Sequence, residues 1–363
     1  MVQGFQTASR PRTGTRVSQG RVGGARPLLR RGEGERKARV CLPCPATATA
    51  ADNKKLQIVE DLQKTRLITA LKTPYLENGR FDLPAYDAFL EKQIENGVEG
   101  VIVGGTTGEG QLMSWDEHIM LIAHTVNAFG RDVKVIGNTG SNSTREAMHA
   151  TEQGFNVGMH ASLQINPYYG KTSEDGLRVH FEKVMDMGPA MIYNVPPRTG
   201  QDIRPEIMES LAEHRHFIGV KECMGNERIA HYSAQGICCW SGNDDEAHDA
   251  RHDAGAVGVV SVTSNVIPSI YAKLMGSEAQ PELNAKVQKL VSWLFAEPNP
   301  IGVNTCLCMT GQVQPVFRLP YTPYNKEMQE EGLQLLKELG EDVIGHENLR
   351  VIDQSEFTIL DFF

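Results

Sequence analysis

The sequence is poor in cysteine and has no long apolar run. Its 363 residues include seven cysteines, without paired CxxC sets or any spacing typical of a metal site. The longest uncharged stretches, such as residues 254–272, are interrupted by polar residues and Pro268, so we expect no membrane-spanning helix. Hydrophobic residues at 40% and charged residues at 22% exclude a mainly disordered or collagenous chain. Five cysteines are predicted to be reduced core thiols: Cys223, Cys238, Cys239, Cys306 and Cys308.

Charge is unevenly distributed, with positive charge concentrated in the first 50 residues. That segment carries ten Lys or Arg and two acids, a net charge of +8, so the remainder carries −17 to reach the total of −9. Such an acidic body repels polyanions, and we expect no nucleic-acid or membrane partner. The basic head is rich in Arg, Ser, Thr and Gly, contains Cys41 and Cys44, and ends in small residues. It is predicted to be an organelle transit peptide over residues 1–50, with a basic disordered tail as the alternative.

From residue 66 onward one pattern repeats: a short apolar run, a loop rich in Gly, Thr or Asn, and a segment of helical period. This alternation predicts a (β/α)8 TIM barrel over residues 51–283, and an open doubly wound sheet stays possible from the pattern alone. The eight runs are Leu67–Ala70, Gly100–Val103, Val133–Ile136, Ala161–Ile165, Ala190–Tyr193, Phe217–Val220, Ile237–Trp240 and Gly258–Val262.

Beyond residue 283 the alternation stops. Leu283–Phe295, a stretch around Pro298 and Pro300, and Lys326–Leu339 favour helices, which predicts a C-terminal helical domain over residues 284–363. Within the barrel, two helix starts fit a capping box, Ser114 with Glu117 and Ser143 with Glu146.

Lys221 closes the sixth apolar run, where a barrel strand would direct its amine into the mouth of the barrel. Desolvation there would lower the pKa of the amine and leave the neutral form that attacks a carbonyl. The residue type and position therefore favour a Schiff-base nucleophile. The alternative is a lysine that pairs with Glu222 or caps a helix.

Two further strand ends carry candidate groups. Tyr193 closes the fifth run, where a phenol could relay protons, and Arg198 follows on a proline-stiffened loop, where it could bind a carboxylate. The segment 104–110, GGTTGEG, could approach an anion through its backbone, and Thr106 and Thr107 add hydroxyl donors. The plain alternatives are a turn with a solvated arginine and an ordinary loop.

Other polar and aromatic groups carry weaker signals. Tyr168 and Tyr169 lie in a loop after the fourth run, and packing alone would explain them. His248 and His252 are four residues apart on a predicted helix, but no third ligand accompanies them. We expect a solvated helix face there and no metal site.

Four motifs together resemble the dihydrodipicolinate synthase family of pyruvate-dependent Schiff-base lyases: GGTTGE (104–109), NPYYG (166–170), YNVPPRTG (193–200) and GVKE (219–222). The segment GEGQLMSWDEH (108–118) resembles the plant and algal chloroplast form. The resemblance covers residue 60 to the C-terminus and implies a (β/α)8 barrel with a C-terminal helical domain. It also implies condensation of pyruvate with L-aspartate 4-semialdehyde to 4-hydroxy-tetrahydrodipicolinate and water, the first committed step of lysine biosynthesis by the diaminopimelate pathway.

Residue by residue, the resemblance assigns the imine to Lys221 and a proton relay to Tyr193, Thr106 and Tyr169, the last reaching in from a neighbouring subunit. The resemblance also implies a homo-oligomer, either a dimer or a tetramer. It implies no metal or organic cofactor, because the protonated imine itself accepts electrons. Substrate binding is assigned to Thr107 for the pyruvate carboxylate, Arg198 for the semialdehyde carboxylate, and Val260.

The resemblance further implies feedback inhibition by L-lysine at a subunit interface. Trp115 stands where many bacterial members have histidine, which is similar to the plant pattern. Asn142 and Glu146 are expected to lie one helical turn apart and to hold an ammonium group. The matching positions are Gly110, Gln111, Trp115, His118, Asn142, Glu146 and Tyr168.

Three alternatives to this function stay open. N-acetylneuraminate lyases and 2-keto-3-deoxy-sugar-acid aldolases share the lysine and tyrosine, but the sialic-acid enzymes have a Ser-Thr pair at 106–107 and lack the arginine at 198. A non-catalytic sensor or scaffold barrel would have lost the lysine or the relay, and both are present. A metal-dependent aldolase would need a ligand cluster at the strand ends.

Overall fold

Eight parallel strands close into a barrel in sequence order. The computed structural model describes residues 50–361, so the predicted transit peptide up to residue 49 and its two cysteines lie outside the described residues. Strand β1 pairs with both β2 and β8, which closes the sheet, confirms the barrel and rules out the open sheet. The strands are β1 (Leu67–Ala70), β2 (Gly100–Val103), β3 (Lys134–Asn138), β4 (Ala161–Ile165), β5 (Ala190–Asn194), β6 (Phe217–Glu222), β7 (Cys239–Ser241) and β8 (Gly258–Ser261).

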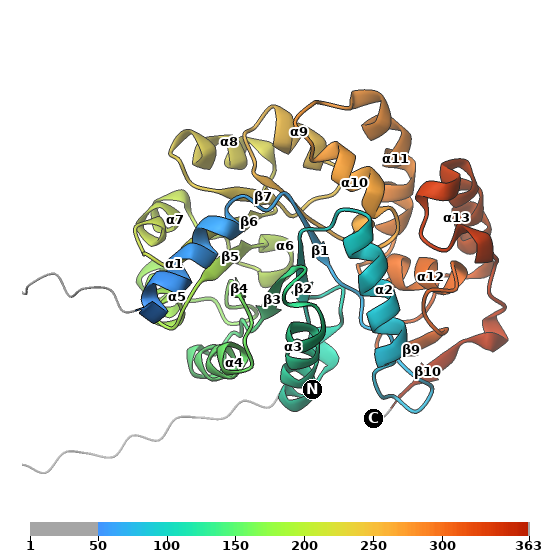
Figure 1. The fold of residues 1–363 in the computed structure, drawn as a ribbon, viewed down its shortest axis with the longest axis horizontal. Coiled ribbons are helices and arrows are strands. Elements are labelled where there is room, and N and C mark those ends of the chain that lie inside the picture. The colour runs from blue at the N-terminus through green and yellow to red at the C-terminus, as the bar shows by residue number, and fades with distance from the viewer. Residues whose placement is uncertain (1–49, 362–363) are drawn as a thin grey trace, which may run out of the picture. The chain divides into compact units, whose positions relative to one another are not determined.

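Helices surround this barrel (Figure 1). Helix α1 (Ala50–Leu62) comes before the first strand and was not predicted; its Val59 and Leu62 join the hydrophobic cluster inside the barrel. The barrel helices are α2 (Leu83–Glu95), α3 (Trp115–Phe129), α4 (Thr144–Asn156), α5 (Glu174–Met185), α6 (Pro196–Thr199), α7 (Pro205–Ala212), α8 (Asn226–Ala234), α9 (Ala247–His252) and α10 (Pro268–Leu274).

Local sequence explains where these helices start. Ser114 and Glu117 form the reciprocal capping box at α3. At α4 the Ser143 side chain accepts from the Glu146 N–H, whereas the Ser143 N–H donates to Ser141. The second cap is therefore one-sided, because the Glu146 side chain is directed toward a cavity instead.

The barrel interior is packed with apolar side chains and is not a pore. Ile68, Ile102, Ile136, Met191 and Trp240 are at most 1% exposed and belong to one cluster. Alternate residues on the strands point outward to the helices, as expected for a parallel barrel. The reactive groups can therefore reach a ligand only at the ends of the strands.

Three helices follow the barrel, as predicted: α11 (Pro281–Leu294), α12 (Ile301–Met309) and α13 (Lys326–Leu339). Leu290, Leu307 and Leu336 from these helices share one buried cluster with Leu67 of β1, so barrel and C-terminal helices have a continuous core. Two short parallel strands, β9 (Val316–Arg318) and β10 (Thr358–Leu360), were not predicted.

The predicted thiols are free, and three of them, Cys239, Cys306 and Cys308, are buried. Cys223 and Cys238 are only half-buried. Over residues 50–361, no helix has the length and apolar character needed to cross a membrane.

The expectation for His248 was wrong. Its side chain is 5% exposed and accepts a hydrogen bond from the Gln280 N–H at 2.9 Å, so it packs where α9 meets the start of α11. Its ring lies 4.8 Å from that of His252. Tertiary packing buried a group that sequence alone placed on a solvated face.

Candidate active site

Tyr193 and Lys221 are neighbours at the carboxyl ends of β5 and β6. The two residues are register partners, and the Lys221 Nζ lies 4.3 Å from the centre of the Tyr193 ring. Both side chains are less than a tenth exposed. Because they leave adjacent strands on the same face, both point into the mouth of the barrel.

Burial sets the protonation of this pair. It lowers the pKa of the Lys221 amine, the nearby Arg198 acts in the same direction, and the neighbouring Cys223 and Asp244 oppose the shift. Burial raises the pKa of the Tyr193 phenol, and Arg198 offsets that only in part. The site therefore holds a lysine that is easier to deprotonate beside a phenol that keeps its proton.

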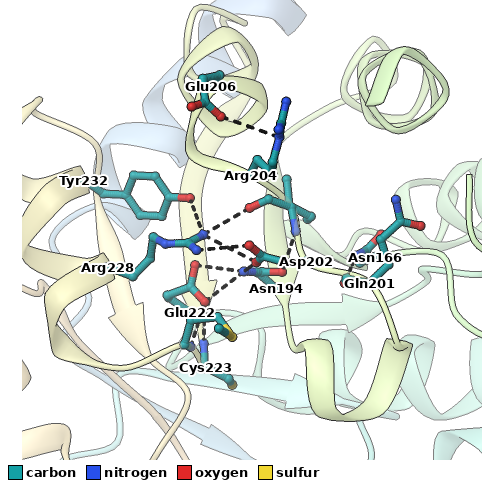
Figure 2. A network of polar contacts seen from close by, with 12 residues as sticks. Asn166, Asn194, Gln201, Asp202, Arg204, Glu206, Glu222, Cys223, Arg228 and Tyr232 are labelled. Atoms are coloured by element: carbon teal, nitrogen blue, oxygen red, sulfur yellow. Dashed lines mark hydrogen bonds and ion pairs between the residues drawn. The ribbon is translucent and has the colours of Figure 1, made fainter. Parts of the chain in front are cut away.

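The residues that follow this pair meet on the opposite face of the strands. Asn194 and Glu222 are also register partners, and the Asn194 Nδ2 donates to both carboxylate oxygens of Glu222, at 3.0 and 3.1 Å. Glu222 also accepts the N–H groups of Cys223 and Met224, each at 2.9 Å, so it caps the chain as it leaves β6 (Figure 2). Glu222 thus holds the strand and does not pair with Lys221.

This contact continues into the segment that follows α6, the short helix that carries Arg198. The Asn194 Nδ2 donates to Asp202, and its oxygen accepts the Ile203 N–H. Arg228 of α8 forms an ion pair with Asp202 at 3.0 Å and donates to the Ile203 carbonyl at 3.2 Å (Figure 2). The network fixes the ends of β5 and β6 and the segment between α6 and α7 relative to one another.

We expect Glu222→Gln to flatten the pH dependence of stability. Burial raises the pKa of Glu222 from 4.5 to about 7, although hydrogen bonds from Asn194 and Met224 oppose the shift. Between these values the folded protein keeps a proton that the unfolded chain has lost, so this group lowers the free energy of unfolding as pH rises through that window, by about 3 kcal/mol in all.

The measurement is thermal unfolding of wild type and variant from pH 4.5 to 8. Glu227→Gln, an exposed position on α8, is the control for loss of a charge. Wild type and Glu227→Gln should lose stability over this range and Glu222→Gln should lose less. Equal slopes for all three would contradict the role assigned to burial.

Five of the predicted residues line one cavity of about 220 Å3 at the carboxyl end of the barrel: Thr106, Thr107, Tyr193, Arg198 and Lys221. The cavity also contains groups that the motifs did not indicate, namely Asn138, Cys223, Asn243, Phe295 and Asn299. Asn138 ends β3 and Asn243 follows β7, so their positions at strand ends could have identified them as candidate site residues. Phe295 and Asn299 come from the connection between α11 and α12, which no local pattern places at the barrel mouth.

The glycine-rich loop after β2 is anchored from two sides. Thr107 is 2% exposed and its Oγ1 accepts from the Asn299 Nδ2 at 3.1 Å. Glu109, whose φ of 60° is left-handed, forms a buried ion pair with Lys72 and accepts from Asn304 of α12 at 2.6 Å. Barrel and C-terminal helices together therefore hold the two threonines in place.

Gly242 after β7 leaves the space that the lysine side chain occupies. A Cβ at this position would lie 3.1 Å from the Lys221 Cε and would collide with the Cys223 Sγ. A larger residue would displace the amine from its place beside Tyr193. Sequence analysis did not single out this glycine.

Val260 and Tyr169 do not line this cavity. Val260 is fully buried in the barrel interior, and Val262, two residues further along, reaches the cavity. Tyr169 is 97% exposed and has a left-handed φ of 69°, which is unusual for a residue with a side chain. Its ring therefore projects away from its own barrel.

A second cavity of about 270 Å3 contains all seven residues predicted to bind lysine: Gly110, Gln111, Trp115, His118, Asn142, Glu146 and Tyr168. Asn142 precedes the N-cap of α4, so it is not on the helix as expected, but it still lies beside Glu146 in this wall. Its Nδ2 donates to the Tyr168 carbonyl at 3.4 Å.

The aromatic side of the second cavity is electrically neutral. Trp115 and His118 stack with ring centres 5.5 Å apart and an interplanar angle of 11°. Burial lowers the pKa of His118 to about 4, so the imidazole is uncharged at neutral pH. Gly104 lets this ring approach closely, because any Cβ there would collide with it.

The two cavities share part of one wall. Thr106, Asn138 and Ile165 contribute to both. The Asn138 Nδ2 donates to the Gly104 carbonyl at 2.8 Å, which joins β3 to the loop that carries both threonines. In the part of the chain that the structure describes, no group of three or more His, Cys, Asp or Glu is placed to hold a metal ion.

The fold and site define a class of protein: a (β/α)8 barrel that presents a buried lysine, with a lowered pKa, beside a protonated tyrosine for imine chemistry. The model of the dihydrodipicolinate synthetase family matches residues 63–339, and the chain belongs to this family. The resemblance found in the four motifs is thereby confirmed.

Curated relatives and solved structures agree with this assignment. The chain is 59% identical to the chloroplastic 4-hydroxy-tetrahydrodipicolinate synthase of Nicotiana tabacum (85% of this chain, 86% of the relative), and 57% identical to a chloroplastic 4-hydroxy-tetrahydrodipicolinate synthase of Arabidopsis thaliana (85% of each). Among solved structures, the Cyanidioschyzon merolae enzyme with lysine bound superposes with a TM-score of 0.72 at 29% identity (79% and 99% covered). The Acinetobacter baumannii enzyme complexed with pyruvate gives 0.73 at 31% identity (78% and 99% covered).

Proposed function

We propose that this chain condenses pyruvate with L-aspartate 4-semialdehyde to give 4-hydroxy-tetrahydrodipicolinate and water. The observation that carries the proposal is the pairing of Lys221 with Tyr193 in a cavity that also contains two threonine hydroxyls and an arginine. A neutral amine attacks the ketone, a phenol moves protons, and the hydroxyls and the guanidinium bind carboxylates.

In the first half of the reaction, the Lys221 amine adds to the C2 carbonyl of pyruvate. The carbinolamine loses water and becomes a protonated imine, with Tyr193 and Thr106 carrying the proton to the departing oxygen. Thr107, fixed by Asn299, holds the pyruvate carboxylate. No organic cofactor is needed, because the protonated imine draws electrons from C3 when a methyl proton leaves.

In the second half, the resulting enamine attacks the aldehyde carbon through C3 and forms a carbon–carbon bond, and the aldehyde oxygen becomes a hydroxyl. The amino group of the semialdehyde then attacks C2 and expels the Lys221 amine, which closes the ring and frees the enzyme. The single water released is the one lost when the imine formed. Arg198 at the mouth of the cavity binds the carboxylate of the second substrate.

This assignment predicts a selective effect of Arg198→Ala. Loss of charge-assisted hydrogen bonds should raise the KM for the semialdehyde about 10- to 100-fold. Trapping of pyruvate by borohydride should fall far less, because the guanidinium acts on imine formation only through its secondary effect on the pKa of Lys221, for which burial is the main cause. Arg204→Ala, an exposed arginine paired with Glu174, is the matched control. Equal losses in both steps would contradict the role given to Arg198.

We also propose that L-lysine binds in the second cavity and thereby inhibits the enzyme. Glu146 and Asn142 supply a carboxylate and an amide for an ammonium group, the neutral His118 adds no repelling charge, and Trp115 offers apolar area to the alkyl chain. The Cyanidioschyzon merolae relative was solved with lysine bound. An initial-rate curve that stays flat up to millimolar lysine would refute the regulatory part of the proposal.

Tyr169 supports a homo-oligomer in which one subunit completes the site of another. An exposed ring on a left-handed residue suits a side chain that enters a neighbouring barrel mouth. We therefore expect the active species to be a dimer or a tetramer, and Tyr169→Phe to lower kcat without changing the oligomer. Gel filtration with activity assays checks this, and a fully active monomer would overturn it.

The composition of the N-terminal segment and the relatives together indicate the subcellular location. The Nicotiana and Arabidopsis relatives are chloroplastic, and the basic, acid-poor residues 1–50 have the character of a transit peptide. We propose the chloroplast stroma as the location of the mature chain. Import into isolated chloroplasts, with loss of the head, is the test.

Borohydride reduction in the presence of pyruvate, followed by peptide mass mapping, tests the central proposal. An adduct on Lys221 supports imine chemistry, and assays with a panel of aldehydes then identify the acceptor. An adduct with turnover only of sugar aldehydes would favour a sugar-acid aldolase. A folded protein that forms no adduct would favour the hypothesis of a non-catalytic sensor or scaffold barrel.

A further inference from the structure

A short C-terminal segment, Arg318 to Tyr321, lies against the outside of the second cavity. Arg318 ends β9 and is fully buried, with its guanidinium 4.2 Å from the centre of the Tyr75 ring. Its Nη2 donates to Glu117 at 2.8 Å and its Nη1 to the Leu112 carbonyl at 3.3 Å. One side chain therefore connects the start of α3 with the 3-10 turn η1 (Gly110–Leu112).

Tyr321, three residues further on, makes a second contact of the same kind. Its hydroxyl accepts a hydrogen bond from the Gln111 Nε2 at 2.7 Å. Gln111 is exposed and lines the second cavity, whereas Tyr321 itself does not line it. The tyrosine thus acts on the cavity only through the glutamine amide.

These contacts hold the elements that carry four of the seven residues predicted to bind lysine, namely Gly110, Gln111, Trp115 and His118. A three-residue 3-10 turn has little hydrogen bonding of its own, so external contacts decide its position. Partial burial would raise the pKa of Glu117, but hydrogen bonds from Arg318 and the Ser114 backbone lower it, so the carboxylate stays ionised.

The last strand holds this segment in place. Arg318 is the register partner of Leu360 in β10, the Leu319 N–H donates to the Leu360 carbonyl at 3.0 Å, and the rings of Phe317 and Phe357 meet edge to face at 5.7 Å. The match to the family model ends at residue 339, so β10 lies in the part of the chain beyond it. The positions of Arg318 and Tyr321 therefore depend on a segment that the shared barrel does not include.

We propose that Arg318 and Tyr321 are positioning residues of the second cavity, and that the C-terminal segment sets the affinity of this cavity for its amino-acid ligand. The inference rests on the proposed regulation by lysine. Tyr321 engages the Gln111 Nε2, so it holds this side chain in the cavity wall and leaves the amide oxygen to accept from a ligand ammonium. Arg318 fixes the distance between the turn with Gln111 and the helix with Trp115. Neither residue lines the cavity that contains Lys221, so catalysis without lysine does not depend on them.

The test uses the full-length chain and L-lysine as the probe, with affinity from titration calorimetry and inhibition from initial rates. Tyr321→Phe removes only the hydroxyl, and its lysine dissociation and inhibition constants should rise roughly three- to tenfold. Arg318→Gln should raise both at least as much, and Arg318→Lys should restore part of the loss. Leu319→Ala, an exposed residue in the same segment, is the control and should match wild type. In all four variants kcat and the pyruvate KM without lysine should stay within about twofold of wild type.

A double variant separates positioning from general loosening of the fold. In a Gln111→Ala background, Tyr321→Phe should have no further effect on lysine affinity, because the group it positions is gone. Additive effects would overturn the inference, as would unchanged lysine affinity in Tyr321→Phe or a parallel loss of kcat. Wild-type protein that does not bind lysine would refute the regulatory proposal itself, and with it this inference.

Discussion

Lys221→Ala is expected to lower kcat about a thousand-fold or more and to abolish the pyruvate adduct. Among the described residues that line this cavity, Lys221 is the one lysine, its Nζ lies 4.3 Å from the centre of the Tyr193 ring, and burial lowers its pKa toward the reactive form. Without it the enamine cannot form, and no other lining residue replaces that step. The measurements are steady-state turnover and mass mapping after borohydride reduction.

Lys221→Arg is the informative companion variant. It keeps a positive charge beside the Tyr193 ring but supplies no amine that becomes neutral near pH 7. We expect it to be as inactive as the alanine variant, with a thermal midpoint close to wild type. Substantial turnover by either variant, or a pyruvate adduct on another lysine, would remove Lys221 from the mechanism.

Tyr193→Phe is expected to lower kcat about a hundred-fold or more, within the range for loss of a proton-transfer group. The phenylalanine ring keeps the packing around the amine, so the lysine stays buried and its environment changes little. In the proposed mechanism, the lost hydroxyl is the group that carries protons while the carbinolamine loses water. Borohydride should therefore still trap pyruvate on Lys221, but more slowly.

Tyr86→Phe provides the control, since it removes another buried hydroxyl, one that bonds to Thr125 between α2 and α3. It should cost stability and leave the trapping rate unchanged. If Tyr193→Phe traps pyruvate at the wild-type rate and also turns over normally, a different group must move the protons.

Short buried strands are visible in sequence because both of their faces must be apolar. This is why all eight predicted runs fall on the observed strands to within two residues at either end, the later start of β7, at Cys239 rather than Ile237, being the largest difference at a strand's first residue. Strands β9 and β10 were not predicted. Val316 and Thr358 pair across a long stretch of chain, and neither has a partner nearby in the sequence. Long-range pairing leaves no periodic pattern to detect.

Site residues at the ends of strands were predictable from the sequence. Residues on the opposite face of a strand, or from the C-terminal region, were much less so. Glu222 was considered only as a partner for Lys221, but successive residues of a strand point to opposite faces, and it binds Asn194 instead. Asn299 reaches Thr107 from the C-terminal region, and only the tertiary fold brings the two together. The roles given to Val260 and Tyr169 stay predictions that biochemical tests must decide.

Thr106, Asn138 and Ile165 line both cavities, so a ligand that moves these residues in one cavity also changes the shape of the other. For any two sites coupled in this way, linkage requires the same factor in both directions. If lysine weakens the binding of pyruvate tenfold, pyruvate must weaken the binding of lysine tenfold. Inhibition by lysine would then be strongest at low pyruvate concentration and would weaken as pyruvate accumulates. The activity of the enzyme would therefore depend on the ratio of substrate to end product.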